Sequence, residues 1–157
     1  MAASAREGGR VVVVGVGNPE RGDDAAGRAV ARALGVSLGD VDIVEEDGEA
    51  TRLLARLEGA NAAYLVDACV SGAKPGAIRR FDVSAGPLPQ TAFGASTHGF
   101  GLGEALELAR ALGALPSRCV VYAIEGESFE AGASISPSVA AAVDIVADRL
   151  RADILGE

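Results

Sequence analysis

The chain of 157 residues lacks tryptophan, has a single histidine and two cysteines, and contains only 4% aromatic residues. Its cysteines, Cys69 and Cys119, form no C-x-x-C pair, so neither a disulfide scaffold nor a thiol redox motif is indicated. The apolar run at residues 11–14 is far shorter than the roughly 20 residues that cross a bilayer. We therefore expect a cytoplasmic protein with no membrane association.

Basic residues are also scarce, with 14 Lys and Arg against 22 Asp and Glu, for a formal net charge of −8. The longest basic run is Arg79–Arg80. An acidic chain is repelled by phosphate backbones and by anionic membrane surfaces. Nucleic-acid binding is therefore not expected.

The chain is rich in hydrophobic residues, which make up 49% of it, and its mean hydropathy is +0.27. Its length is near the commonest size of one domain, long enough to bury a core. No internal repeat or linker interrupts it. We predict a flexible tail at residues 1–10, rich in Ala, Gly and Ser, followed by one domain at residues 11–157.

Strand-like and helix-like segments alternate along the domain. Short β-branched or apolar runs predict strands, and apolar residues at helical spacing predict helices, the last with Ser136 as N-cap and Pro137 at its first position. The expected strands are 11–16, 41–45, 62–66, 77–83 and 119–124, and the expected helices are 24–34, 51–57, 102–112 and 137–154. This alternation predicts an α/β fold with a mostly parallel sheet covered on both faces, and an edge strand at 77–83. Residues 84–97 are expected to form a long loop.

Three residues with catalytic or metal-binding potential lie where strands are expected to end. Asp24 follows the first strand, Asp67 directly ends the third, and His98, the sole histidine, follows the long loop. In open α/β sheets, functional groups gather beyond the carboxyl ends of the strands. Two carboxylates and one imidazole suit a divalent cation such as nickel, zinc or iron. The spacing alone cannot show that the three residues meet.

Each of these residues also has a purely structural interpretation. A lone histidine is more often exposed or capping than a ligand, and Asp23–Asp24 could cap a helix, with Asp23 as the cap and Asp24 facing a cleft. Asp67 is harder to explain structurally, because a carboxylate at the margin of the core needs a cation or hydrogen-bond donors.

Two other chemistries are represented by weaker patterns. Cys69 with His98 could form a nucleophilic dyad, although a small buried cysteine is the commoner state. Gly15-x-Gly17 resembles the start of a dinucleotide fingerprint but lacks its third glycine, so a nucleotide- or phosphate-binding protein is an alternative that the pattern supports poorly.

Five segments together resemble the hydrogenase maturation endopeptidases, over nearly the whole chain. They are VGVGNPERGDDAAG (14–27), LVDA (65–68), STHGFGL (96–102), IEGESFE (124–130) and ISPSV (135–139). The resemblance implies a three-layer α/β/α domain whose five-stranded twisted sheet has one antiparallel edge strand. It implies an endopeptidase that removes the C-terminal extension of a nickel–iron hydrogenase large-subunit precursor after nickel insertion.

Carried over residue by residue, the resemblance assigns Asp24, Asp67 and His98 as both catalytic residues and metal ligands. The metal would be nickel carried by the substrate, with other divalent cations as substitutes, and the protein itself is expected to be a monomer. Nickel could act as a Lewis acid or lower the pKa of a bound water; alternatively, an aspartate could be the general base, as in aspartic-type hydrolysis. A non-catalytic module that binds the nickel-loaded precursor would share every one of these motifs.

The chain departs from the family pattern at two loops. Gly99 stands where some relatives have Gln, and residues 47–51 read Asp-Gly-Glu-Ala-Thr where many relatives have Asp-Gly-Gly-Thr. We expect the second change to stiffen the loop and alter how the substrate fits.

Overall fold

The computed structural model describes residues 9–35, 40–89 and 97–156, with backbone alone for residues 97–100. Five strands form one sheet in the order β2-β1-β3-β5-β4. The strands are β1 (Arg10–Val16), β2 (Asp42–Glu46), β3 (Ala60–Cys69), β4 (Ile78–Asp82) and β5 (Arg118–Glu125). The helices are the 3-10 turn η2 (Gly22–Ala25), α1 (Ala26–Leu34), α2 (Ala50–Leu57), α3 (Thr97–Ala111) and α4 (Pro137–Leu155).

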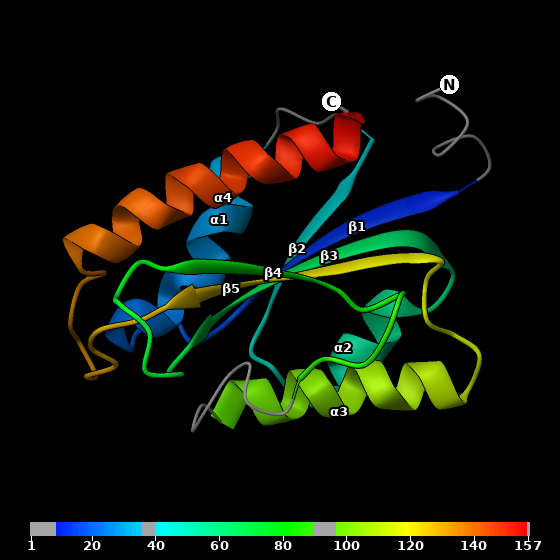
Figure 1. The fold of residues 1–157 in the computed structure, drawn as a ribbon, viewed down its shortest axis with the longest axis horizontal. Coiled ribbons are helices and arrows are strands. Elements are labelled where there is room, and N and C mark those ends of the chain that lie inside the picture. Colours follow the sequence, from blue (N-terminus) through cyan, green and yellow to red (C-terminus); the bar gives the residue numbers. More distant parts are fainter. Residues whose placement is uncertain (1–8, 36–39, 90–96, 157) are drawn as a thin grey trace.

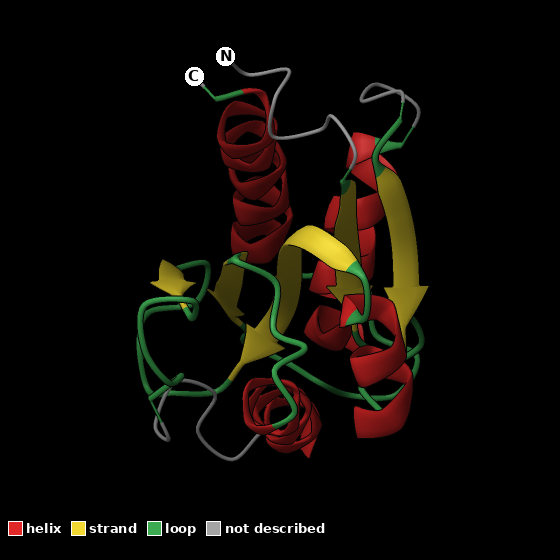
Figure 2. Ribbon diagram, turned by 90° about the vertical axis from the view of Figure 1, so that its right-hand side faces the viewer, coloured by secondary structure: helices red, strands yellow, loops and turns green. Residues whose placement is uncertain are grey.

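Helices cover both faces of the sheet, which gives three layers (Figures 1 and 2). Helices α1 and α4 pack together on one face, and α2 and α3 pack together on the other. Strands β2, β1, β3 and β5 are parallel, whereas β4 runs antiparallel to β5 at the edge. The predicted α/β architecture, with its antiparallel edge strand, is confirmed.

Strand β1 shows why the sheet needs both layers. Val11 and Val13 belong to the core under α1 and α4, while Val12 and Val14 belong to the core under α2 and α3. Successive side chains of a strand point to opposite faces, so a run of four valines is buried only in the middle of a covered sheet. The unbroken valine run is thus explained by two helical layers.

Most elements begin and end within a few residues of the predicted bounds. Strand β3 is longer than predicted, because its pairing with β5 continues through Asp67 opposite Ala123 to Cys69 opposite Glu125. Asp67 therefore lies inside the strand and does not terminate it. The predicted tail falls mostly on residues 1–8, outside the described residues, and β1 already begins at Arg10. The long loop at 84–97 is described only up to residue 89.

Within the described part of the chain, no helix has both the length and the apolar character that a membrane span requires.

Candidate active site

The order of the strands creates a switch point between β1 and β3. The chain leaves β1 through α1 on one face to reach β2, and it leaves β3 toward β4 and β5 on the other side of the sheet. Where connections from neighbouring parallel strands diverge, a crevice opens outside their carboxyl ends. Asp24 follows β1 and Asp67 lies near the carboxyl end of β3, so both are placed beside this switch point.

Glycines allow the first loop to fold tightly against itself and against the sheet. A Cβ on Gly17, whose φ is 149°, would lie 1.9 Å from the carbonyl oxygen of Asp24. A Cβ on Gly27 would lie 2.3 Å from the carbonyl oxygen of Val66 and 2.4 Å from that of Val16. Only glycine permits such contacts. They bring η2, which carries Asp24, directly against β3.

Asp24 is buried, with 3% of its surface exposed, and its Oδ2 accepts a hydrogen bond of 3.0 Å from the backbone N–H of Asn18. The same loop is tied to strand β2, because the N–H of Gly17 donates to the carbonyl of Glu46. Arg28 donates through Nε to the carbonyl of Gly17. The carboxylate of Asp24 is therefore held by a loop that is itself fixed from two sides.

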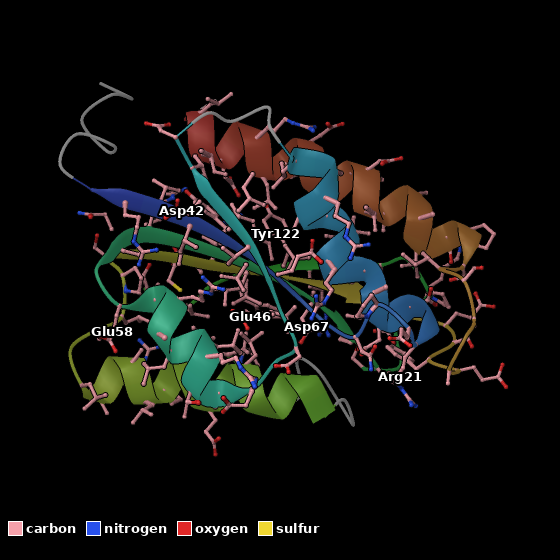
Figure 3. All side chains as sticks on the ribbon, turned by 180° about the vertical axis from the view of Figure 1, so that it is seen from behind. Arg21, Asp42, Glu46, Glu58, Asp67 and Tyr122 are labelled. Carbon is pink, nitrogen blue, oxygen red and sulfur yellow. The ribbon has the colours of Figure 1, made fainter. Side chains whose placement is uncertain are left out.

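Asp67 is completely buried, and its Oδ1 accepts a hydrogen bond of 2.8 Å from the N–H of Ala68. Its neighbours at alternate positions, Leu65 and Cys69, belong to the core under α2 and α3, so Asp67 faces that layer. Figure 3 shows Asp67 near Glu46 at one end of the sheet. A carboxylate on a buried face is costly unless donors or a cation compensate its charge.

Helix α3 starts at this same end of the sheet (Figure 1). A Cβ on Gly101 would lie 2.1 Å from the carbonyl oxygen of Gly48, so the beginning of α3 packs against the loop after β2. His98 occupies the first turn of this helix. Its side chain lies outside the described residues, so its meeting with Asp24 and Asp67 stays a prediction.

Of the three predicted metal ligands, Asp24 and Asp67 are buried on two elements that pack together, η2 and β3, and His98 is in the first turn of α3; their meeting at one metal ion stays a prediction. Among the described side chains, which do not include His98, no group of three or more His, Cys, Asp or Glu residues is arranged to hold a metal ion. The donor set fits a divalent cation chemically, since two buried carboxylates offer oxygen ligands where a positive charge would be compensated.

Asp23 does not cap the first helix, so the structural interpretation that it could do so is not supported. Its buried carboxylate accepts hydrogen bonds from the N–H groups of Glu127 (2.8 Å), Ser128 (3.0 Å) and Ser136 (2.7 Å), and from the hydroxyl of Ser136. Burial raises the pKa of Asp23, but the hydrogen bonds from Ser136, Glu127 and Ser128 outweigh it and leave the pKa below its ordinary value. Asp23 joins the first loop to the segment between β5 and α4.

The sequence analysis missed two further buried acids at this edge, Glu46 and Glu125, which end β2 and β5. Oε2 of Glu46 lies 2.6 Å from Nε of Arg56 in an ion pair. Glu125 accepts hydrogen bonds from Ser71 and Gly72. Burial raises the pKa of Glu125, but the hydrogen bonds from Ser71, Cys69 and Gly72 together outweigh it and leave the pKa below its ordinary value. The sequence does contain a signal for them, because Glu46 and Glu125 each directly follow a predicted strand, as Asp67 does.

Cys69 is not suited to act as a nucleophile. It is 1% exposed, and its thiol donates to Oε1 of Glu125 at 3.4 Å. Burial raises the pKa of this thiol to about 11, so it stays protonated at neutral pH. Because the thiolate is the reactive form, a Cys69–His98 dyad is not supported.

Protein acceptors already take most of the N–H groups that the first loop could offer a phosphate. Gly17 donates to Glu46, Asn18 to Asp24, Glu20 to Asn18, Arg21 to Asn18 and Asp23 to Ser128. A nucleotide-binding turn directs such groups at the phosphate, and here two buried acids follow. The nucleotide alternative is therefore disfavoured.

Similar proteins share this architecture. A family model described as HycI, hydrogenase maturation protease, matches residues 30–152, a range that contains Asp67 and His98 but begins after Asp24. No curated protein matches the sequence.

Among solved structures, the hydrogenase maturating endopeptidase HybD from E. coli superposes with a TM-score of 0.75 at 25% identity, over 92% of this chain and 91% of that one. An endopeptidase from Escherichia coli gives 0.78 at 25% identity, over 90% and 89%. The nickel–iron hydrogenase maturation protease HycI from Thermococcus kodakarensis gives 0.68 at 27% identity, over 94% and 93%. Because the family model matches most of its length, the chain belongs to the hydrogenase maturation protease family.

Proposed function

We propose that this protein is an endopeptidase that removes the C-terminal extension of a nickel–iron hydrogenase large-subunit precursor after nickel has been inserted. Asp24, Asp67 and His98 act together at the crevice between β1 and β3. The nickel arrives with the substrate. The observation that supports the proposal is the burial of two carboxylates, Asp24 and Asp67, on the packed elements η2 and β3 at the switch point, with the sole histidine in the first turn of α3.

The buried carboxylates account for recognition of a metal-loaded substrate. Two desolvated carboxylates repel each other, and a cation that approaches both of them relieves this repulsion most effectively. The hydrogen bond from Asn18 to Asp24 and that from Ala68 to Asp67 fix one oxygen of each group. A precursor without nickel offers no such compensation, so it should be left uncut.

The same residues supply the chemistry of peptide hydrolysis. Nickel on the substrate adds Lewis-acid character at the reacting carbonyl when it is present. A carboxylate at the crevice accepts one proton of the attacking water, and the leaving amine takes up a proton as the peptide bond breaks.

A mass measurement on a natural-type substrate tests the proposal. The protein is incubated with a nickel-loaded large-subunit precursor and, in parallel, with the same precursor lacking nickel. We expect the mass of the loaded precursor to fall by that of its C-terminal extension, and the mass of the nickel-free precursor to stay unchanged. Tight binding of the loaded precursor with no mass change would overturn the peptidase and support a non-catalytic binding module.

The role of nickel can be separated from that of the acids. Loading the precursor with zinc tests whether another divalent cation substitutes, as carboxylate and imidazole ligands allow. Cleavage of the zinc form at a rate close to that of the nickel form would show that charge and position suffice. Loss of cleavage would assign a specific role to nickel.

A further inference from the structure

A surface pocket lies beside the first loop, on residues to which the proposed reaction assigns no role. Its volume is about 440 Å³, and residues 18–21 and 131–133 line it. We call it the loop pocket. Pockets of roughly 300–1,000 Å³ are typical of ligand sites, so the loop pocket can hold several atoms of a bound chain.

The loop pocket is coupled directly to Asp24. The backbone N–H of Asn18 donates to the carboxylate of Asp24, while Asn18 itself lines the pocket. One residue therefore touches the catalytic carboxylate and the pocket. Arg21 also lines the pocket.

The two walls of the loop pocket are fastened together, so the hollow is a built feature. The N–H of Gly132 donates to the carbonyl of Glu20 across the pocket at 2.8 Å. Behind it, the carboxylate of Asp23 binds Glu127, Ser128 and Ser136, which flank the second wall. Because hydrogen bonds hold its walls in two places, the pocket is preformed, and binding there avoids the entropy cost of ordering a loop.

The lining indicates a polypeptide as the occupant. One wall consists of small residues (Ala131, Gly132, Ala133), which leave room, and the other carries Glu20 and Arg21. Both of these side chains are exposed, and neither joins an ion pair among the residues that the structure describes. A site that presents one charge of each sign suits a polar peptide and disfavours a phosphate.

We propose that the loop pocket binds an extended segment of the precursor next to the bond that is cut, so that the substrate chain passes over the first loop between the pocket and Asp24. This inference rests on the proposed function. It makes the loop pocket a determinant of substrate affinity. Ala131 belongs to its wall of small residues, and Arg21 belongs to its charged wall.

Filling the loop pocket tests the inference by steady-state cleavage of the nickel-loaded precursor. Ala131→Leu adds bulk at an exposed position, so the fold and the melting temperature should stay unchanged. We expect KM to rise at least about tenfold with little change in kcat, since a contact made equally in ground and transition states affects KM alone. Ala111→Leu, an exposed position at the far end of α3, is the matched control and should leave KM unchanged.

A cysteine label gives an independent measurement. Cys69 and Cys119 are buried, and burial raises their pKa values to about 11 and about 12, so an introduced surface cysteine reacts selectively with a maleimide. Labelled Ala131→Cys protein should show the same rise in KM, and labelled Ala111→Cys protein should not.

The outcomes separate this inference from the proposed function. If the unmodified protein does not cut the precursor, the proposed function fails. If it cuts, and both Ala131→Leu and the labelled Ala131→Cys protein keep the original KM, the loop pocket is not a substrate site. A fall in kcat at constant KM would likewise overturn it.

Discussion

The two ends of the sheet differ in whether their charged side chains are buried or exposed. All five buried charged side chains of the described residues lie at the carboxyl ends of strands, and all are acids: Asp23, Asp24, Glu46, Asp67 and Glu125. At the amino ends, charged groups meet in solvent; Arg10, for example, pairs with Asp42 at 3.5 Å, with 38% and 53% of the two side chains exposed.

This difference shows where the burial of charge costs folding free energy, namely at the carboxyl ends of the strands. Exposed ion pairs cost little and add little, whereas each buried carboxylate must be compensated by donors, by a cation or by both. Among the buried acids, Asp23, Glu46 and Glu125 are bound by hydrogen-bond donors or by an arginine. Asp24 and Asp67 also accept hydrogen bonds, from Asn18 and Ala68, and under the proposed function they meet the metal of the substrate as well. The acids of one edge therefore serve two purposes, and substitutions can tell them apart.

The largest effect is expected from neutralising the crevice acids. Asp67→Asn should reduce cleavage of the nickel-loaded precursor by about 10³-fold, within the usual range for loss of a catalytic proton acceptor. It should not lower the melting temperature, because an amide oxygen can still accept from the N–H of Ala68 and a buried charge is removed. Asp24→Asn and His98→Ala should behave in the same way. Normal cleavage by any of them would remove that residue from the mechanism.

A large loss of stability is expected where glycine lets the crevice close. Gly27→Ala places a Cβ 2.3 Å from the carbonyl oxygen of Val66, so the backbone of α1 or β3 must move. We expect the free energy of unfolding to fall by roughly 3 kcal/mol, the upper part of the usual range for overpacking. Denaturant unfolding measures it. Gly103→Ala in α3 is the control, since nothing lies within 4 Å of its added Cβ and it should be neutral or stabilising. Equal stabilities for the two variants would contradict the close approach.

Asp23 tests the structural use of a buried acid. Asp23→Asn directs an NH₂ group toward donors from Glu127, Ser128 and Ser136, so at neutral pH it should cost about 2 kcal/mol. The pKa of Asp23 is lower in the folded protein than its ordinary 3.8, so its contribution is complete above that pH and is lost as the pH falls through the folded value. The gap between wild type and variant should therefore shrink only below about pH 3.8.

Urea unfolding of wild type and Asp23→Asn at pH 7, 4 and 3 measures this gap. Asp144→Asn, at an exposed position of α4, should show no such dependence. A gap of constant size down to pH 3 would contradict the ionised, hydrogen-bonded state of Asp23.

The sequence predicted local elements well and remote partners poorly. The valine run of β1 and the Ser136–Pro137 start of α4 are determined by residues close together in the chain, so their periodicity and capping pattern suffice. Ser136 is indeed the N-cap residue, yet its hydroxyl donates to Asp23, 113 positions away, and not to its own helix. Nothing local distinguishes those two uses of a serine. For the same reason the sequence could not separate a helix-capping Asp23 from one that binds a remote segment.

The candidate site also combines features that local sequence predicts with features that depend on remote partners. The apolar run before Asp67 predicted a strand that ends there, whereas Asp67 lies inside β3. Both the longer strand and the burial of Asp67 depend on pairing with β5, which no local pattern reveals. The meeting of Asp24 with β3 rests on Gly27, whose contact with Val66 spans two strands and two helices of sequence. The resemblance to a family supplied the grouping of Asp24, Asp67 and His98 because it encodes such contacts indirectly.

The smallest effect is expected at the opposite end of the sheet, where the amino ends of the parallel strands lie. Arg10 donates to the carbonyls of Arg56 and Glu58 and pairs with Asp42. These contacts are largely exposed, so Arg10→Ala should lower the free energy of unfolding by no more than about 1 kcal/mol, and the Asp42 part of that loss should vanish in high salt. Cleavage of the precursor should be unchanged, because no acid of the crevice depends on Arg10. A cleavage defect without a stability defect would mean that the precursor also contacts the amino end, and the assignment of function to a single edge would then be wrong.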